Sequence, residues 1–121
     1  MGIVNFIEHS NICASRNELI ALFENTLLAF GVDKFVYSLA RGSFTASHKT
    51  HHGLARSYPE SWMKHYTERS YVNCDPTYRH ALGTKGAFTW KSLRETIPLT
   101  KSETRVMNEA QEAGLQNGVT L

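Results

Sequence analysis

Residues 58–76 read YPESWMKHYTERSYVNCDP and combine four large aromatic side chains with two prolines and a single aspartate. Both prolines mark helix starts. Pro59 precedes residues 60–70, which favour a helix, and Asp75 is a preferred N-cap residue followed by Pro76 at the first helical position. We therefore predict two successive helices from this stretch, the second of them short.

The aromatic residues of this stretch have helical spacing. Tyr58, Trp62 and Tyr66 follow one another at intervals of four, so they share one helical face. Buried tyrosine and tryptophan need partners for their O–H and N–H groups. Asp75 can act as a helix cap, and its carboxylate has further lone pairs for other donors. Two interpretations stay open: a core stripe with internal acceptors, or a pocket wall whose polar tips face a ligand.

Helix signals also precede this stretch. Ile3, Phe6 and Ile7 have the spacing of a short helix. Residues 15–18 (SRNE) form a capping-box pattern ahead of a second apolar helical face, and Gly31 stands where such a helix ends. We predict two N-terminal helices.

Strand signals follow these two helices. Residues 34–40 are β-branched and aromatic, and residues 41–43 (RGS) indicate a turn, so a second strand is expected within residues 44–54. Two such strands form an antiparallel hairpin, which needs helices or further strands to cover it. Residues 118–121 resemble the beginning of another strand.

A final helix is expected after a second capping-box pattern at residues 100–103 (TKSE), and Gly114 closes it. The element order is helix, helix, strand, strand, three helices and an incipient strand. This order predicts an α/β (α+β) fold, an α-β-α sandwich with an antiparallel sheet, of which residues 1–121 are the N-terminal part.

Composition limits the class of protein. With 121 residues, 41% hydrophobic and 20% charged, the chain is expected to form one soluble domain in the cytoplasm. The net charge of +2 is too small to indicate nucleic-acid binding. No apolar run approaches the length of a membrane span. Cys13 and Cys74 stand in no motif and are expected to be reduced thiols.

The spacing in residues 58–76 resembles the autoinducer-binding domain of LuxR-type quorum-sensing regulators. The family pattern is Tyr-Pro, a tryptophan, two tyrosines and Asp-Pro. This sequence repeats it at Tyr58-Pro59, Trp62, Tyr66, Tyr71 and Asp75-Pro76. A later tryptophan of the family corresponds to Trp90. The family's Gly-Leu-x-x-Gly-x-Thr pattern is met by Gly114-Leu115, Gly118 and Thr120.

The resemblance implies an N-acyl homoserine lactone as the ligand, with no cofactor. The indole N–H of Trp62 suits the lactone carbonyl, the Asp75 carboxylate suits the amide N–H, and the Tyr58 hydroxyl suits the acyl carbonyl. Trp90 is expected to pack on the lactone ring. The acyl channel and the rest of the site are expected to comprise Val36, Tyr66, Thr77, Val106, Ala110, Leu115 and Thr120.

The sequence departs from the family pattern in two ways. Ala87 stands where the family has a proline three residues before Trp90. The family domain also continues through further strands and then a DNA-binding helix-turn-helix domain. We therefore expect residues 1–121 to be an incomplete autoinducer-binding domain that binds no DNA by itself. The expected partners are a second copy, in a homodimer, or full-length regulators, in a heterodimer.

Other functions have weaker support in the sequence. His48 and His51 lack a third metal ligand at a recognised spacing, so no metal site is predicted. No nucleophile motif appears, and we expect no enzyme. Three hypotheses remain: a lactone sensor of a transcription regulator, a short relative that pairs with full-length regulators and inactivates them, and a sensor for another small amphiphilic ligand.

Overall fold

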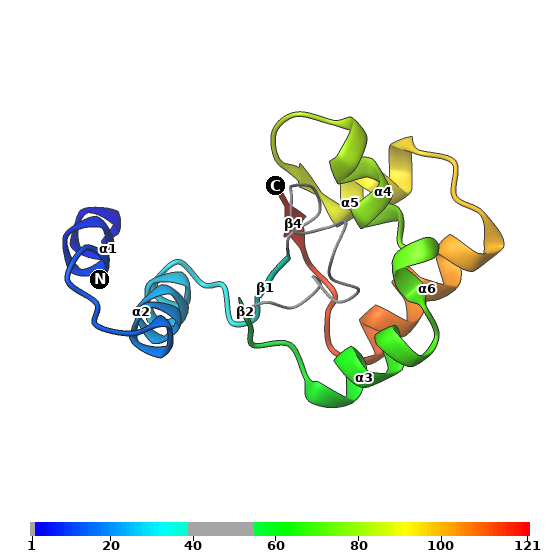
Figure 1. Ribbon diagram of the computed structural model, residues 1–121. Helices are drawn as coiled ribbons and strands as arrows, with labels where there is room; N and C mark the ends of the chain where they lie inside the picture. The colour runs from blue at the N-terminus through cyan, green and yellow to red at the C-terminus, as the bar shows by residue number, and fades with distance from the viewer. Residues whose placement is uncertain (1, 39–54) are drawn as a thin grey trace. The chain divides into compact units, whose positions relative to one another are not determined.

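The computed structural model describes residues 2–38 and 55–121 (Figure 1). The chain divides into two compact units, Met1–Tyr58 and Pro59–Leu121, and each is described by itself. Both combine α-helices with a short antiparallel strand pair, which confirms the predicted α+β class. The predicted turn at residues 41–43, the predicted strand within 44–54, and both His48 and His51 lie outside the described residues.

The first unit begins with two helices, α1 (Ile3–Ser10) and α2 (Arg16–Ala29), as predicted. The Ser15 hydroxyl accepts a hydrogen bond from the backbone N–H of Glu18 at 3.2 Å. The Glu18 carboxylate in turn accepts a hydrogen bond from the backbone N–H of Ala14 at 2.7 Å. In a regular capping box it would accept from the N–H of Ser15, the next residue. The cap therefore satisfies two backbone donors, with the return bond shifted by one residue.

A short antiparallel pair follows, between β1 (Val36–Tyr37) and β2 (Ala55–Arg56). Of the strand predicted at residues 34–40, residues 36–37 form β1, and residues 39–40 lie outside the described residues. Phe35, just before β1, exchanges hydrogen bonds with Ser57: its N–H donates to the Ser57 hydroxyl at 2.9 Å, and its carbonyl accepts from the Ser57 N–H at 2.8 Å. Aromatic rings from the two helices and this segment pack together. The ring centroid of Phe23 in α2 lies 5.8 Å from that of Phe6 in α1 and 5.1 Å from that of Phe35.

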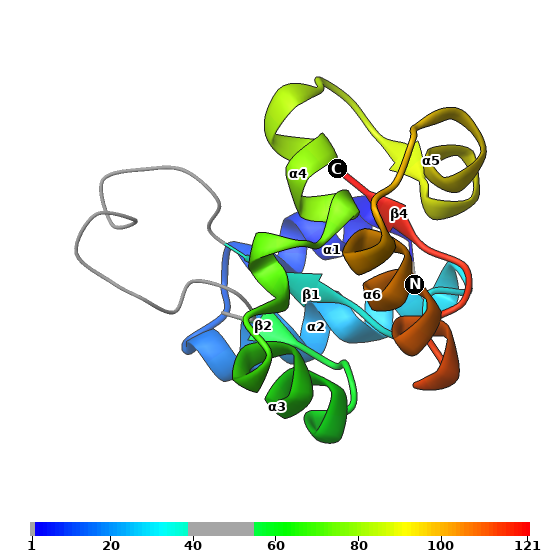
Figure 2. The same ribbon diagram turned by 90° about the vertical axis from the view of Figure 1, so that its right-hand side faces the viewer.

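The second unit contains most of the helices. They are α3 (Glu60–Glu68), the 3₁₀ turn η1 (Tyr71–Asn73), α4 (Pro76–Gly83), α5 (Trp90–Thr96) and α6 (Lys101–Glu112), which Figure 2 shows from the side. The capping box at Thr100 is complete, because its hydroxyl and the Glu103 carboxylate each accept a backbone N–H of the other residue. Gly114 adopts a left-handed φ of +92°, which ends α6 as predicted.

A second strand pair connects distant parts of this unit. β3 (Phe88–Thr89) pairs antiparallel with β4 (Val119–Thr120). The predicted strand near the end of the sequence is confirmed, but β3 and the helix α5 were not predicted. Their one local signal is the Thr89 hydroxyl, which caps α5 by accepting the backbone N–H of Ser92 at 3.1 Å.

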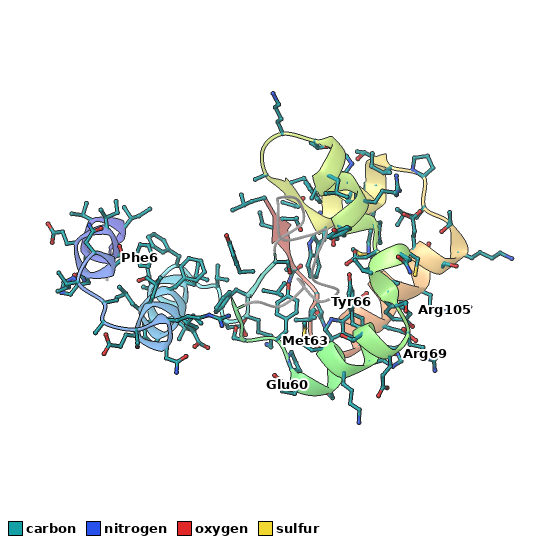
Figure 3. The ribbon with its side chains drawn as sticks, in the orientation of Figure 1. Phe6, Glu60, Met63, Tyr66, Arg69 and Arg105 are labelled. Carbon is teal, nitrogen blue, oxygen red and sulfur yellow. The ribbon has the colours of Figure 1, made fainter. Side chains whose placement is uncertain are left out.

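The core of the second unit lies between its helices. Figure 3 shows Tyr66 and Met63 on the inner side of α3, and both side chains are 4% exposed. The other buried apolar and aromatic residues of this unit are Trp62, Tyr71, Pro76, Leu93, Val106, Met107, Ala110 and Leu115. None of the described helices has both the length and the apolar character needed to cross a membrane.

Candidate ligand-binding site

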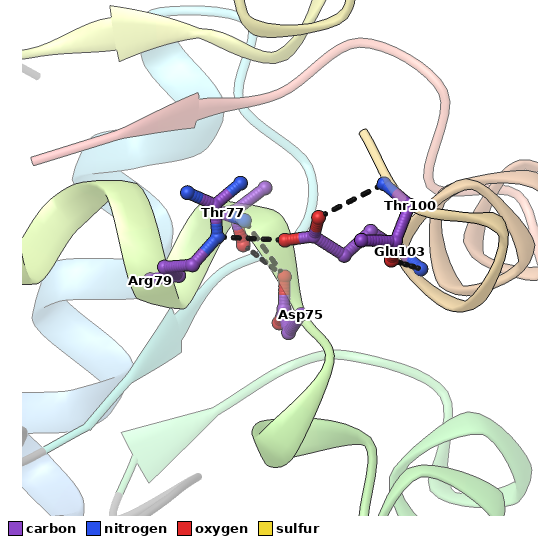
Figure 4. A network of polar contacts seen from close by, with 5 residues as sticks. All are labelled: Asp75, Thr77, Arg79, Thr100 and Glu103. Carbon is purple, nitrogen blue, oxygen red and sulfur yellow. Dashed lines mark hydrogen bonds and ion pairs between the residues drawn. The ribbon is translucent and has the colours of Figure 1, made fainter. Parts of the chain in front are cut away.

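The centre of the candidate site is the Asp75 carboxylate at the start of α4. Its Oδ1 accepts the backbone N–H of Thr77 at 2.9 Å and the Thr77 hydroxyl at 2.7 Å (Figure 4). Its Oδ2 accepts the hydroxyl of Tyr66 at 2.6 Å. Asp75 is 9% exposed. The predicted helix cap is confirmed, and the second oxygen meets one of the predicted aromatic residues.

Tyr66 therefore has a polar partner in addition to its ring contacts. Burial, followed by the proximity of Asp75 and the hydrogen bond to it, raises the pKa of the Tyr66 hydroxyl far above its usual value. The hydroxyl stays protonated and acts as a donor at any physiological pH. The resemblance implied only an apolar wall for Tyr66, whereas the structure makes it part of the hydrogen-bonded set around Asp75.

A second polar contact ties α4 to α6. Arg79 Nε donates to Glu103 Oε2 at 2.7 Å, and Glu103 Oε1 accepts the backbone N–H of Thr100 at 3.1 Å (Figure 4). Burial alone would raise the pKa of Glu103, but the hydrogen bonds from Arg79 and Thr100 outweigh it and hold that pKa below its usual value. Asp75 at the start of α4 is thereby fixed relative to α6. Glu103 was predicted only as part of the capping box, and no role was predicted for Arg79.

This ion pair predicts a dependence of stability on pH. The folded-state pKa of Glu103 lies below its unfolded value of 4.5, so its stabilising contribution is present above that pH. The contribution is lost as the pH falls through the lowered folded-state pKa. We expect Glu103→Gln to reduce the free energy of unfolding at neutral pH by about 1–3 kcal/mol and to flatten its acid dependence. Urea denaturation across the acidic range measures both effects.

Glu112→Gln provides the matched control for this experiment. Glu112 is exposed on the same helix, so its substitution should leave the pH profile unchanged. If Glu103→Gln keeps the stability and the acid dependence of the unaltered protein, the ion pair does not contribute to folding.

Trp90 and Thr120, both predicted site residues, contact each other. Trp90 Nε1 donates to the Thr120 hydroxyl at 2.9 Å, and the Trp90 backbone N–H donates to the Gly118 carbonyl at 2.9 Å. A Cβ atom on Gly118 would lie 2.2 Å from two atoms of the Trp90 ring. The indole of Trp90 can lie beside β4 only because Gly118 has no side chain. The family pattern contains a glycine at this position but does not indicate this reason for it.

The predicted apolar residues of the second unit lie together along α6 and its end. Val106, Ala110 and Leu115 are all buried, and the backbone N–H of Leu115 donates to the Ala110 carbonyl at 2.9 Å. Val36 in β1 and Tyr58 after β2 belong to the first unit, where both are half-buried.

An open hollow of about 490 Å³ lies over the outer side of α6. It is lined by Leu99, Lys101, Thr104, Arg105, Asn108, Glu109 and Glu112. None of these is a predicted ligand-binding residue, and the charged lining does not suit an acyl chain. Within residues 2–38 and 55–121, no group of three or more His, Cys, Asp and Glu side chains is placed to hold a metal ion.

Comparison with known proteins identifies the family. A family model described as the autoinducer binding domain matches residues 15–121. The chain is 28% identical over 107 residues to the transcriptional activator protein AnoR of Acinetobacter nosocomialis, covering 88% of this chain and 43% of AnoR. It is 28% identical over 65 residues to the transcriptional activator protein TraR of Rhizobium radiobacter, covering 54% of this chain and 28% of TraR.

A third relative is similar in kind. The transcriptional activator protein SolR of Ralstonia solanacearum is 29% identical over 63 residues, which cover 52% of this chain and 25% of SolR. The chain thus spans less than half the length of these curated relatives. Because the family model matches most of the chain, the resemblance found in the sequence is confirmed. The chain belongs to the autoinducer-binding domain family of LuxR-type transcriptional activators.

Proposed function

We propose that this chain senses N-acyl homoserine lactones through Asp75, which accepts the amide N–H of the ligand. The observation that carries the proposal is the environment of this carboxylate. Asp75 is buried, and hydroxyl groups of Tyr66 and Thr77 fix its two oxygens. An acceptor that is already oriented loses little conformational freedom when a ligand binds.

The carboxylate has capacity for one more donor. It accepts hydrogen bonds from the Tyr66 hydroxyl, the Thr77 hydroxyl and the Thr77 backbone N–H. An ionised carboxylate offers about four lone-pair sites. The helix cap and the proposed ligand contact are therefore compatible, because the cap occupies mainly one oxygen.

The remaining contacts follow the chemistry of the ligand. Trp62 supplies an N–H for the lactone carbonyl, and Trp90 packs on the lactone ring. The acyl chain lies along Tyr66, Val106, Ala110 and Leu115. The names of the relatives, all transcriptional activators, support a role in transcription regulation, and the autoinducer-binding family model supports a role in quorum sensing. We further propose that the chain acts in the cytoplasm, paired with a second copy or with a full-length regulator.

Acyl chain length tests the proposal. Each methylene buried against the apolar residues contributes about 0.8 kcal/mol, so each added carbon should tighten binding about fourfold until the channel is filled. Isothermal calorimetry with N-acyl homoserine lactones of roughly four to twelve acyl carbons measures how the affinity changes with each methylene. The melting temperature should rise in the same order, since ligand binding stabilises the folded state.

The ring-opened N-acyl homoserines serve as ligand controls, because they keep the acyl chain and the amide but have a carboxylate and a hydroxyl group in place of the lactone ring. They should bind much more weakly. Equal affinity for ring-opened ligands and lactones, or neither heat nor stabilisation with any lactone, would refute the proposed function.

A further inference from the structure

The ring of Trp62 lies within a cluster of aromatic side chains. Its centroid is 6.0 Å from that of Tyr66, 6.2 Å from that of Tyr71 and 6.1 Å from that of His65. His65 and Tyr71 meet edge to face at 5.3 Å. Trp62 itself is 7% exposed. The orientation of its indole therefore depends on where these three rings are held.

One carboxylate of α6 contacts two of the three rings. Glu109 Oε2 accepts the Tyr71 hydroxyl, and the same oxygen lies 3.3 Å from His65 Nε2. The hydrogen bond from Tyr71 lowers the pKa of Glu109 in spite of partial burial, so the side chain is an ionised acceptor at neutral pH. Glu109 thus connects α6 to both α3 and η1 through side chains that enclose Trp62.

Hydrogen bonds fix direction better than ring contacts do. Tilted and edge-to-face pairs tolerate a range of angles, as the interplanar angles of 44° to 88° in this cluster illustrate. A charge-assisted bond to a hydroxyl instead holds two named atoms at one short separation. Of the contacts in this cluster, those to Glu109 define where the rings of Tyr71 and His65 lie.

We propose that Glu109 is a positioning residue for Trp62. By holding Tyr71 and His65, it sets the orientation of the indole that donates to the lactone carbonyl, although it does not touch the ligand itself. The expected effect of Glu109 on lactone affinity rests on the proposed function. The structural part of the inference, the dependence of Trp62 on Glu109, stands without a ligand.

Fluorine NMR measures the structural part in the ligand-free protein. The full chain contains two tryptophans, so incorporation of 5-fluorotryptophan gives two resonances, and Trp62→Phe assigns them. Glu109→Ala should shift and broaden the Trp62 resonance and leave that of Trp90 in place. Glu109→Gln keeps an oxygen for the Tyr71 hydroxyl and should restore part of the original spectrum. Tyr71→Phe keeps the ring but removes that hydroxyl, and should reproduce the shift.

Calorimetry with N-octanoyl homoserine lactone measures the consequence for binding. Glu109→Ala should raise the dissociation constant on the order of tenfold, and Glu109→Gln should raise it less. Glu112→Ala is the matched control, because it removes an exposed carboxylate from the same helix and should change neither the spectrum nor the affinity.

The outcomes separate the two proposals. If Tyr71→Phe and Glu109→Ala both fold but leave the Trp62 resonance unchanged, Glu109 does not position Trp62, even if the melting temperature falls. A shifted Trp62 resonance with unchanged lactone affinity would overturn the role of Glu109 in binding and leave its structural role standing. If the unaltered protein binds no lactone, the proposed function fails, while the ligand-free spectra still decide whether Glu109 positions Trp62.

Discussion

Replacing Asp75 by Asn is expected to weaken lactone binding by about tenfold to a hundredfold while helix α4 stays intact. Asn is nearly as good an N-cap as Asp, so its oxygen can keep the bonds from Thr77. The charge disappears, and an amide NH₂ replaces the oxygen that accepts the Tyr66 hydroxyl. A hydrogen bond to a charged group contributes about 1.5–3 kcal/mol, which gives the expected range. Calorimetric titration measures the affinity, and circular dichroism checks the helix content.

Asp33→Asn is the matched control for the lost charge. Asp33 is an exposed aspartate that pairs with Lys34, so its substitution should not affect lactone affinity. If Asp75→Asn and Asp33→Asn bind the lactone equally well, Asp75 is only a helix cap. The interpretation of residues 58–76 as an ordinary core stripe would then be correct.

Gly118→Ala is expected to lower the free energy of unfolding by about 1–3 kcal/mol and to displace Trp90. The added Cβ would lie 2.2 Å from two ring atoms of the indole, far inside the normal contact distance. The backbone cannot move away freely, because the Gly118 carbonyl accepts the Trp90 N–H and the next two residues form β4. Urea denaturation measures the stability, and tryptophan emission reports the displaced ring.

Gly83→Ala makes the same chemical change where there is room for it. A Cβ on Gly83, the last residue of α4, meets nothing within 4 Å, and Ala is the better helix former. This variant should be as stable as the unaltered protein or slightly more so. Should Gly118→Ala match it in stability and emission, the position of Trp90 does not depend on Gly118.

The helix starts were the most predictable part of the fold. A cap is decided by residues within one turn, as at Asp75-Pro76 and at Thr100 with Glu103, so the local sequence contains the whole signal. Strand pairing is not local. The partner of residues 119–120 is β3, a two-residue strand that has no periodicity of its own.

The candidate site was predictable in its residue types but not in its internal contacts. Tyr66 and Asp75 lie nine positions apart in the pattern, and their side chains are hydrogen-bonded. The bond between Tyr71 and Glu109 joins residues 38 apart, and that between Arg79 and Glu103 joins residues 24 apart. Such pairs depend on how α6 packs against the other helices, which no spacing along the chain encodes.

The pairing of β3 with β4 imposes an order on folding during synthesis. The indole N–H of Trp90 donates to the hydroxyl of Thr120, which lies 30 residues further along the chain. This hydrogen bond cannot form until Thr120 has left the ribosome. Helices α3 and α4, with the bond between Tyr66 and Asp75, need only nearby residues and can form earlier. Closing the loop between residues 90 and 120 costs more entropy than closing the shorter loop between Tyr66 and Asp75, because the cost grows with loop length. We therefore expect the contacts around Asp75 to form before Trp90 is positioned, and a ribosome pause before residue 120 to delay the placement of its indole.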